Sequence, residues 1–211
     1  MARRKVSEKT IRRLSHYSMC LRRAMSADIR VITSTYLSKR CGISPAAVRK
    51  DLASYGDFGK QGSGYNVREL LGSIEGILGT GSPPPVAVVG VGNIGRALLE
   101  SGLEGTGGYE YFAAFDTDPE IIGRTFSGVE VRPLSDITEA AEELGDFIAV
   151  VAVPEGLGQS AVDSVTGAGC RAVLSFTPEP IEVPESVMLR YVEVSTELDI
   201  LTHHIRRTEK N

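Results

Sequence analysis

Residues 85–100 read PVAVVGVGNIGRALLE, and this stretch decides the fold of the chain around it. Val86–Val89 is a short run of apolar residues, which predicts a buried parallel strand. The strand leads directly into the pattern Gly-x-Gly-x-x-Gly, and apolar residues at helical spacing follow. A strand, this glycine pattern and a helix in succession predict a dinucleotide-binding βαβ unit. The alternative is a structural turn that binds nothing.

Each glycine of the pattern has its own physical role. Gly90 allows a tight turn, Gly92 leaves the backbone open to a pyrophosphate, and Gly95 lets the helix pack closely on the strand. The amides at the positive end of the helix would then face the phosphates. The predicted phosphate-binding turn comprises Gly90, Val91, Gly92, Asn93, Ile94 and Gly95.

An acidic residue follows where the ribose of a dinucleotide requires one. Tyr111–Phe115 predicts the second strand, and Asp116 comes next, about 20 residues after the glycine pattern. A carboxylate there accepts the hydroxyls of an adenosine ribose and repels a 2′-phosphate. We therefore expect NAD(H) to be preferred over NADP(H).

The formal net charge of −4 conceals a division of the chain into two parts. Residues 1–80 carry 15 Lys+Arg and 6 Asp+Glu, whereas residues 81–211 carry 8 and 21. This asymmetry predicts that the first part contacts a polyanion and the second does not. The segment GTGSPPP, residues 79–85, coincides with the change in charge and predicts a stiff linker.

The basic part carries helix signals in the order of a helix-turn-helix domain. Ser7 predicts the N-cap of a first helix, and Thr33 or Ser34 predicts that of a short second one. Gly42 breaks the chain, and Ser44 followed by proline begins a third helix, which we expect to end near residue 55. The glycine-rich residues 56–65 predict a hairpin, the wing of a winged helix, and residues 67–78 a further helix.

Polar and basic side chains cluster on the third helix and the predicted wing. Such side chains reach base edges or phosphates when a recognition helix enters the major groove. The alternative is an ordinary solvated helix face. The candidate DNA-contacting residues are Ser44, Arg49, Lys50, Ser54, Tyr55 and Lys60.

The acidic part alternates strand and helix signals, which predicts an α/β domain with a doubly wound parallel sheet. Further strands are predicted at residues 147–153, 172–176 and 191–194, and helices near 136–144 and 159–168. Val153 and Pro154 end one strand, and Phe176 ends the next, at the edge where ligands bind in such sheets. These three residues predict a nicotinamide pocket. An amphipathic helix over residues 196–207 requires an apolar surface, which another subunit could supply.

The acidic part offers few side chains that could serve in catalysis. It has no evident proton donor or acceptor for hydride transfer, which favours a ligand-reading domain over a dehydrogenase. His203 and His204 have no metal-ligand spacing, so we expect no metal. Cys20, Cys41 and Cys170 lack CxxC spacing, which is typical of reduced thiols in the cytoplasm. Neither a secretory signal nor a membrane span is expected.

The motifs together resemble the Rex family of redox-sensing transcriptional repressors. The matching stretches are Val48-Arg-Lys-Asp-Leu52, Tyr55-Gly56, Gly59-Lys-Gln-Gly-Ser-Gly-Tyr-Asn66, the glycine pattern, Phe115-Asp116, Val153-Pro154, Ser175-Phe-Thr-Pro178 and Val183-Pro184. The resemblance implies a winged helix followed by a Rossmann-type domain, and a homodimer on a palindromic operator. It also implies that NADH releases the DNA, that NAD⁺ competes without releasing it, and that the C-terminal helix is swapped between subunits.

Four positions depart from the family pattern. An arginine is usual at position 19, where Met19 stands, and a tyrosine is frequent at position 101, where Ser101 stands. Glu193 replaces an aspartate, and Ser175 replaces an asparagine. In the family these polar groups are thought to link the nicotinamide to domain closure, so we expect other contacts to serve the switch here.

These observations predict a DNA-binding domain at residues 1–80, an NAD(H)-binding domain at 84–195 and a dimerisation helix at 196–211. The expected protein is a cytoplasmic, NADH-released repressor and not an enzyme. Two alternatives remain: an NAD-dependent oxidoreductase with an appended basic domain, and a repressor of another nucleotide ligand, such as a coenzyme A thioester.

Overall fold

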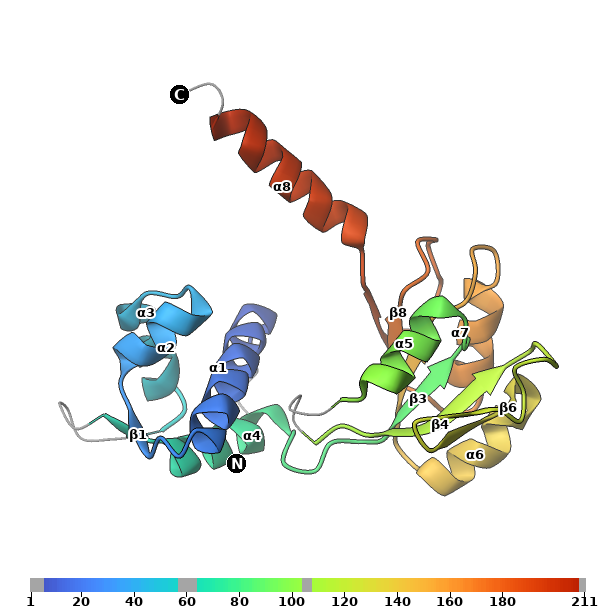
Figure 1. Ribbon diagram of the computed structural model, residues 1–211, viewed down its shortest axis with the longest axis horizontal. Coiled ribbons are helices and arrows are strands. Elements are labelled where there is room, and N and C mark those ends of the chain that lie inside the picture. Colours follow the sequence, from blue (N-terminus) through green and yellow to red (C-terminus); the bar gives the residue numbers. More distant parts are fainter. Residues whose placement is uncertain (1–5, 57–63, 104–107, 209–211) are drawn as a thin grey trace. The chain divides into compact units, whose positions relative to one another are not determined.

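The computed structural model describes residues 6–56, 64–103 and 108–208 (Figure 1). The chain divides into two compact units: the first runs to Pro83 and also includes Gly108, and the second comprises the other described residues from Pro84 onward. We call them the N-terminal unit and the sheet unit. Each has its own apolar core.

The N-terminal unit is mainly helical in its described residues. Its elements are α1 (Glu8–Ser26), β1 (Val31–Ile32), α2 (Ser34–Cys41), α3 (Pro45–Ala53), β2 (Tyr65–Asn66) and α4 (Val67–Leu78). Every one of these helices begins at a polar side chain that accepts a hydrogen bond from an amide of the first turn. The capping residues are Ser7, Thr33, Ser44 and Asn66. The predicted caps of the first and third helices are therefore confirmed.

The core of this unit joins all four helices. Gly42, with a φ of +64°, ends α2 and turns the chain toward α3, an arrangement typical of a helix-turn-helix. The largest aliphatic side chains of the core are Leu14, Leu21, Leu37, Leu52, Leu70, Leu71 and Ile74.

The predicted wing falls largely outside the described residues, since 57–63 are not among them. Tyr65, at its end, belongs to β2, which pairs antiparallel with β1 and places Val31 opposite Asn66. Sequence analysis missed β1 because a strand of two residues shows no periodicity.

The sheet unit contains a seven-stranded sheet in the order β5-β6-β4-β3-β7-β8-β9. All pairs are parallel except β5 with β6. Its strands are β3 (Val86–Val89), β4 (Tyr111–Asp116), β5 (Thr125–Phe126), β6 (Val129–Pro133), β7 (Ile148–Val151), β8 (Ala172–Ser175) and β9 (Met188–Tyr191). Sequence analysis did not foresee β5 and β6. The strand order reverses on either side of β3, as in doubly wound folds.

Helices cover both faces of this sheet. Leu99 of α5 (Asn93–Ser101) packs with Val88 and Ala114 on one face. On the other face, α6 (Ile137–Leu144) and α7 (Gly158–Gly167) pack against Ala149 and Val151. A short 3₁₀ turn, Leu134–Asp136, leads into α6. The predicted α/β class with a doubly wound sheet is confirmed.

The last strand lies three residues earlier than the predicted 191–194. Tyr191 is opposite Ser175, where β8 ends, and the Val192 amide donates one more hydrogen bond to the Ser175 carbonyl. In the described residues that follow, strand pairing does not continue. The chain then forms α8 (Val194–Thr208).

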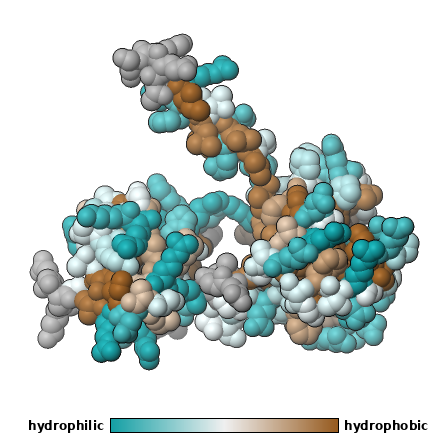
Figure 2. Space-filling model, viewed as in Figure 1, coloured by the Kyte–Doolittle hydropathy of each residue, from teal (hydrophilic) through white to brown (hydrophobic). Residues whose placement is uncertain are grey.

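Within the residues that the structure describes, every residue of helix α8 from Val194 to Arg207 is exposed. Figure 2 shows apolar side chains along it as a brown stripe. Its large apolar residues are Val194, Leu198, Ile200, Leu201 and Ile205, which are between 56 and 66 % exposed. Across the described ranges, no helix combines the length and apolar character needed to cross a membrane.

Candidate nucleotide-binding and DNA-binding sites

The glycine turn follows β3 at the carboxyl edge of the sheet. Gly90 has a φ of +89°, which side-chain-bearing residues rarely adopt, and a Cβ there would lie 2.6 Å from the carbonyl oxygen of Ala152. A Cβ on Gly95 would collide with the carbonyl oxygen of Gly90. Both glycines are therefore required by close packing.

Gly92 differs from its two neighbours because it faces open space. A Cβ on Gly92 would meet nothing within 4 Å. Gly92 is also the N-cap of α5, and no side chain caps that helix. The amides at this helix end are thus left for an external acceptor, which is the arrangement that binds phosphate groups. The turn fits the pyrophosphate of a dinucleotide.

Asp116 ends β4 beside this turn. Its Oδ2 accepts a hydrogen bond from the Val91 amide at 2.6 Å, and its Oδ1 accepts from the amides of Thr117 at 2.7 Å and Asp118 at 2.9 Å. The carboxylate therefore fixes the glycine turn to the end of β4. The oxygens of a carboxylate are acceptors and can also take hydrogen bonds from ribose hydroxyls.

The loops after β7 and β8 lie along the same edge. A Cβ on Gly90 would approach Cγ1 of Val153 to 2.8 Å, so Val153 borders the glycine turn. The amide of Phe176 donates to the carbonyl of Val151 at 2.8 Å. Since the carboxyl ends of β3, β4, β7 and β8 are neighbours, the predicted turn, acid and pocket residues come together at one switch point.

One residue of this edge was not foreseen. The carboxylate of Glu179 accepts hydrogen bonds from the amides of Gly156 at 2.9 Å and Gly158 at 2.6 Å. It thereby ties the loop after β8 to the loop that contains Pro154. The sequence offered only a weak signal, a single acid between two prolines.

Three of the four departures from the family pattern have local hydrogen-bond partners. The Ser175 hydroxyl is buried and within hydrogen-bond distance of the Thr177 hydroxyl, and it accepts from the Thr177 amide at 3.1 Å. The Ser101 hydroxyl donates to the carbonyl of Leu98 at 3.1 Å, and Glu193 accepts from the Thr196 hydroxyl at 2.7 Å. Met19 is 41 % exposed.

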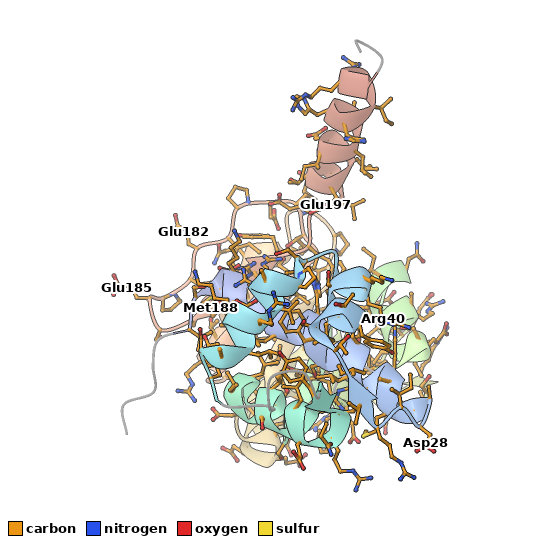
Figure 3. The ribbon with its side chains drawn as sticks, turned by 90° about the vertical axis from the view of Figure 1, so that its left-hand side faces the viewer. Asp28, Arg40, Glu182, Glu185, Met188 and Glu197 are labelled. Atoms are coloured by element: carbon orange, nitrogen blue, oxygen red, sulfur yellow. The ribbon has the colours of Figure 1, made fainter. Side chains whose placement is uncertain are left out.

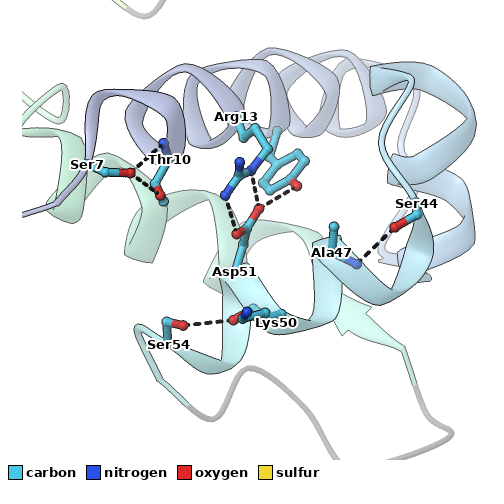
Figure 4. Close-up of polar contacts among 9 residues, drawn as sticks. Ser7, Thr10, Arg13, Ser44, Ala47, Lys50, Asp51 and Ser54 are labelled. Carbon is cyan, nitrogen blue, oxygen red and sulfur yellow. Dashed lines mark hydrogen bonds and ion pairs between the residues drawn. The ribbon is translucent and has the colours of Figure 1, made fainter.

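The candidate DNA residues divide into two groups. Ser44 caps α3 by accepting from the Ala47 amide at 3.2 Å, and the Ser54 hydroxyl donates to the Lys50 carbonyl at 2.8 Å (Figure 4). Tyr55 packs against the core. These contacts give Ser44, Ser54 and Tyr55 structural roles.

Arg49 and Lys50 are the exposed cations of α3. The Arg49 guanidinium donates to the Ser34 hydroxyl, at the start of α2, at 3.2 Å. This contact holds a cation at the junction of the two helices of the helix-turn-helix. Lys60 lies outside the described residues.

A buried cluster that sequence analysis missed joins α3 to α1. Arg13 donates two hydrogen bonds of 2.6 Å to the Asp51 carboxylate, and the Tyr17 hydroxyl donates a third at 2.9 Å (Figure 4). Burial, followed by this hydrogen bond, raises the pKa of Tyr17. The cluster fixes the recognition helix through its inner face. Arg13 and Tyr17 are four positions apart on one helix, whereas the sequence gives no sign that Asp51 of α3 is their partner.

Two family models match the chain. One, described as "Putative DNA-binding protein N-terminus", covers residues 5–53, and one described as "CoA binding domain" covers residues 82–179. Relatives match over nearly the whole length. The redox-sensing transcriptional repressor Rex of Desulfitobacterium hafniense is 39 % identical over 201 residues, which is 95 % of this chain and 96 % of the relative. The chain belongs to the Rex family.

A second relative and two solved structures support the same family membership. The Rex repressor of Syntrophobacter fumaroxidans is 36 % identical over 202 residues, covering 95 % of this chain and 96 % of that protein. The solved structure of RSP in complex with β-NAD⁺ and operator DNA superposes with a TM-score of 0.85 at 30 % identity, over 98 % of this chain and 95 % of that one. The structure of RSP in complex with β-NADH superposes with a TM-score of 0.82 at 28 % sequence identity, over 98 % of this chain and 97 % of that one. The predicted membership of the family is confirmed, and Rex proteins are repressors, not enzymes.

Proposed function

We propose that this Rex protein is a redox-sensing repressor that binds a palindromic operator and is released from it by NADH. NAD⁺ competes for the nucleotide site without releasing the DNA. The protein thereby reports the NADH/NAD⁺ ratio to respiratory or fermentative genes, and it acts in the cytoplasm. Membership of the Rex family and the likeness to RSP with NAD⁺, NADH and operator DNA support this proposal.

The observation that carries the nucleotide assignment is the open, uncapped helix end at Gly92. The first turn of α5 would hold the pyrophosphate, and Asp116 would hold the adenosine ribose. Val153, Pro154 and Phe176 border the place expected for the nicotinamide. A reduced nicotinamide is uncharged and an oxidised one is positive, so one pocket can respond differently to each.

The DNA assignment relies on the helix-turn-helix of α2 and α3. Arg49 and Lys50 would contact base edges or phosphates, and Lys60 the neighbouring groove or backbone. Ser44, Ser54 and Tyr55 would shape the contacting surface. The net charge of +9 over residues 1–80 supports binding to a polyanion.

We further propose a homodimer in which α8 is exchanged between subunits. Its apolar residues Val194, Leu198, Ile200 and Leu201 are exposed. A dimer holds two DNA-binding domains at the spacing of two half-sites. If the nucleotide sets that spacing, a tenfold change in operator occupancy needs NADH to prefer the DNA-incompetent form by only about 1.4 kcal/mol.

A mobility-shift assay tests the proposal. A palindromic operator selected from random duplexes is titrated with NADH, NAD⁺, NADPH and coenzyme A in turn. We expect NADH to release the DNA and the other three to leave it bound. Release by coenzyme A alone would instead favour a repressor of another nucleotide ligand, and NADH oxidation with a small carbonyl compound would favour the oxidoreductase.

A further inference from the structure

Two cysteines that are distant in sequence meet inside the N-terminal unit. The sulfur atoms of Cys20 and Cys41 lie 3.3 Å apart, although 21 positions separate the residues. Cys20 is 5 % exposed, and Cys41 is partly exposed. Both thiols are free, as expected, but the fold makes them neighbours, which their spacing in the sequence did not indicate.

The pair has a specific place in the fold. Cys20 lies in the second half of α1, and Cys41 is the last residue of α2. Gly42 follows, and the capped start of α3 comes two residues later. A bond between the two sulfurs would fasten the end of α2 to α1, next to the turn that leads into the recognition helix.

We propose that Cys20 and Cys41 form a dithiol oxidation site, which a hydroperoxide converts into an intramolecular disulfide. A disulfide has an S–S length of about 2.05 Å, so the sulfurs must approach by roughly 1 Å. A movement of that size is small compared with the size of a side chain. The redox reaction belongs to the N-terminal unit alone and is independent of the nucleotide.

The reaction proceeds in two steps. The sulfur of Cys41, the more accessible of the two, attacks the hydroperoxide, whose O–O bond breaks to give a sulfenic acid and an alcohol or water. The sulfur of Cys20 then attacks the sulfur of Cys41, and the S–O bond breaks with release of water. The two thiols lose two protons and two electrons in all, and the peroxide takes them up.

The surroundings of Cys41 make this a slow site. Burial, followed by the hydrogen bond with Cys20, raises the pKa of the Cys41 thiol to about 12. Since the thiolate is the attacking species, both groups stay reduced under mild conditions. Oxidation is expected only with a strong or sustained supply of peroxide.

Peptide mapping of the full-length protein tests the proposal. The purified chain is treated with hydrogen peroxide, its remaining thiols are alkylated, and it is digested without reductant. We expect one peptide pair linked through Cys20 and Cys41, reversed by dithiothreitol, while Cys170 is alkylated. The proposal would be overturned if Cys20 and Cys41 were alkylated as fully after peroxide treatment as in the untreated, reduced protein. A disulfide between two chains would overturn it as well.

Two variants sharpen this test. Cys41→Ser removes the site, and Cys170→Ser removes the buried thiol of the sheet unit. Peroxide should raise the thermal unfolding midpoint of the wild type and of Cys170→Ser, because a disulfide constrains the unfolded chain. It should leave Cys41→Ser unchanged. An equal shift in all three proteins would refute the bond, and neither DNA nor nucleotide enters the measurement.

Discussion

At the scale of single residues, Asp116 joins two tasks in one carboxylate, because it fastens the glycine turn and faces the proposed ribose site. We predict that Asp116→Ala weakens NADH binding by about 1.5–3 kcal/mol, the range for hydrogen bonds to charged groups. It should also narrow the discrimination against NADPH, since the negative charge is lost. Fluorescence titration with both nucleotides measures the effect. Glu120→Ala, which removes an exposed carboxylate from the same loop, is the control, and unchanged affinities in Asp116→Ala would refute the ribose assignment.

Glu179 provides a second prediction at this scale. In Glu179→Gln, only one side-chain acceptor remains for two backbone amides, so the loop around Pro154 loses a hydrogen bond. We expect NADH affinity to fall about tenfold, as measured by calorimetry. The control is Glu185→Gln, since Figure 3 shows Glu185 projecting outward from the same chain segment. Equal affinities of the two variants would show that Glu179 does not position the site.

Arg49 is the third residue-scale prediction. Arg49→Ala should weaken specific operator binding by about 1–3 kcal/mol, measured by mobility shift. Ser34→Ala removes the hydroxyl that accepts from Arg49 but keeps the cation, and it should bind almost as the wild type does. If Arg49→Ala retains full affinity, Arg49 does not contact the operator.

The glycine turn could be predicted at this scale because its residues are chosen by backbone geometry. A position with a φ of +89°, or one whose backbone must stay open, is occupied by glycine, and that residue can be read directly from the sequence. Hydrogen-bond partners that are distant in the sequence cannot be recognised in this way. Asp51 and Glu179 are ordinary acids in the sequence, and only the fold brings Arg13 or the amide of Gly158 to them.

At the scale of elements, the buried pair of α1 and α3 should matter more than the exposed pair beside it. Arg13→Ala leaves Asp51 partly uncompensated, and we expect a loss of about 2–4 kcal/mol in unfolding free energy. The neighbouring Arg12→Ala breaks an ion pair with Glu8 whose side chains are 65 % and 61 % exposed, so its effect should stay below about 1 kcal/mol. Urea denaturation measures both, and similar losses would contradict the assigned role of the cluster.

Helices were predicted better than strands for a physical reason. A helix announces its start locally, as Ser7 and Ser44 do, because the cap and the amides that it satisfies are adjacent in sequence. A strand ends where its partner ends. Strand β9 ends at Tyr191 because its partner β8 ends at Ser175. The two residues of β1 form a strand only because they pair with β2.

At the scale of the whole molecule, the apolar face of α8 is predicted to hold the dimer together. Leu198→Asp combined with Leu201→Asp places two charges on that face and should convert the dimer to a monomer in sedimentation analysis. Both units should remain folded, since each has its own core. His203→Asp, on the opposite face by helical periodicity, should leave the dimer intact. A dimeric double variant would exclude α8 from the interface.

The connection between β9 and α8 leaves almost no slack. Only Val192 and Glu193 separate the two elements, and both are engaged: the Val192 amide is bonded to the sheet, and Glu193 accepts from the first turn of the helix. Because this connection is short and hydrogen-bonded, we expect α8 to move together with the sheet edge when that edge tilts. In a dimer that exchanges this helix, a movement of one subunit's sheet would shift its α8 against the other subunit.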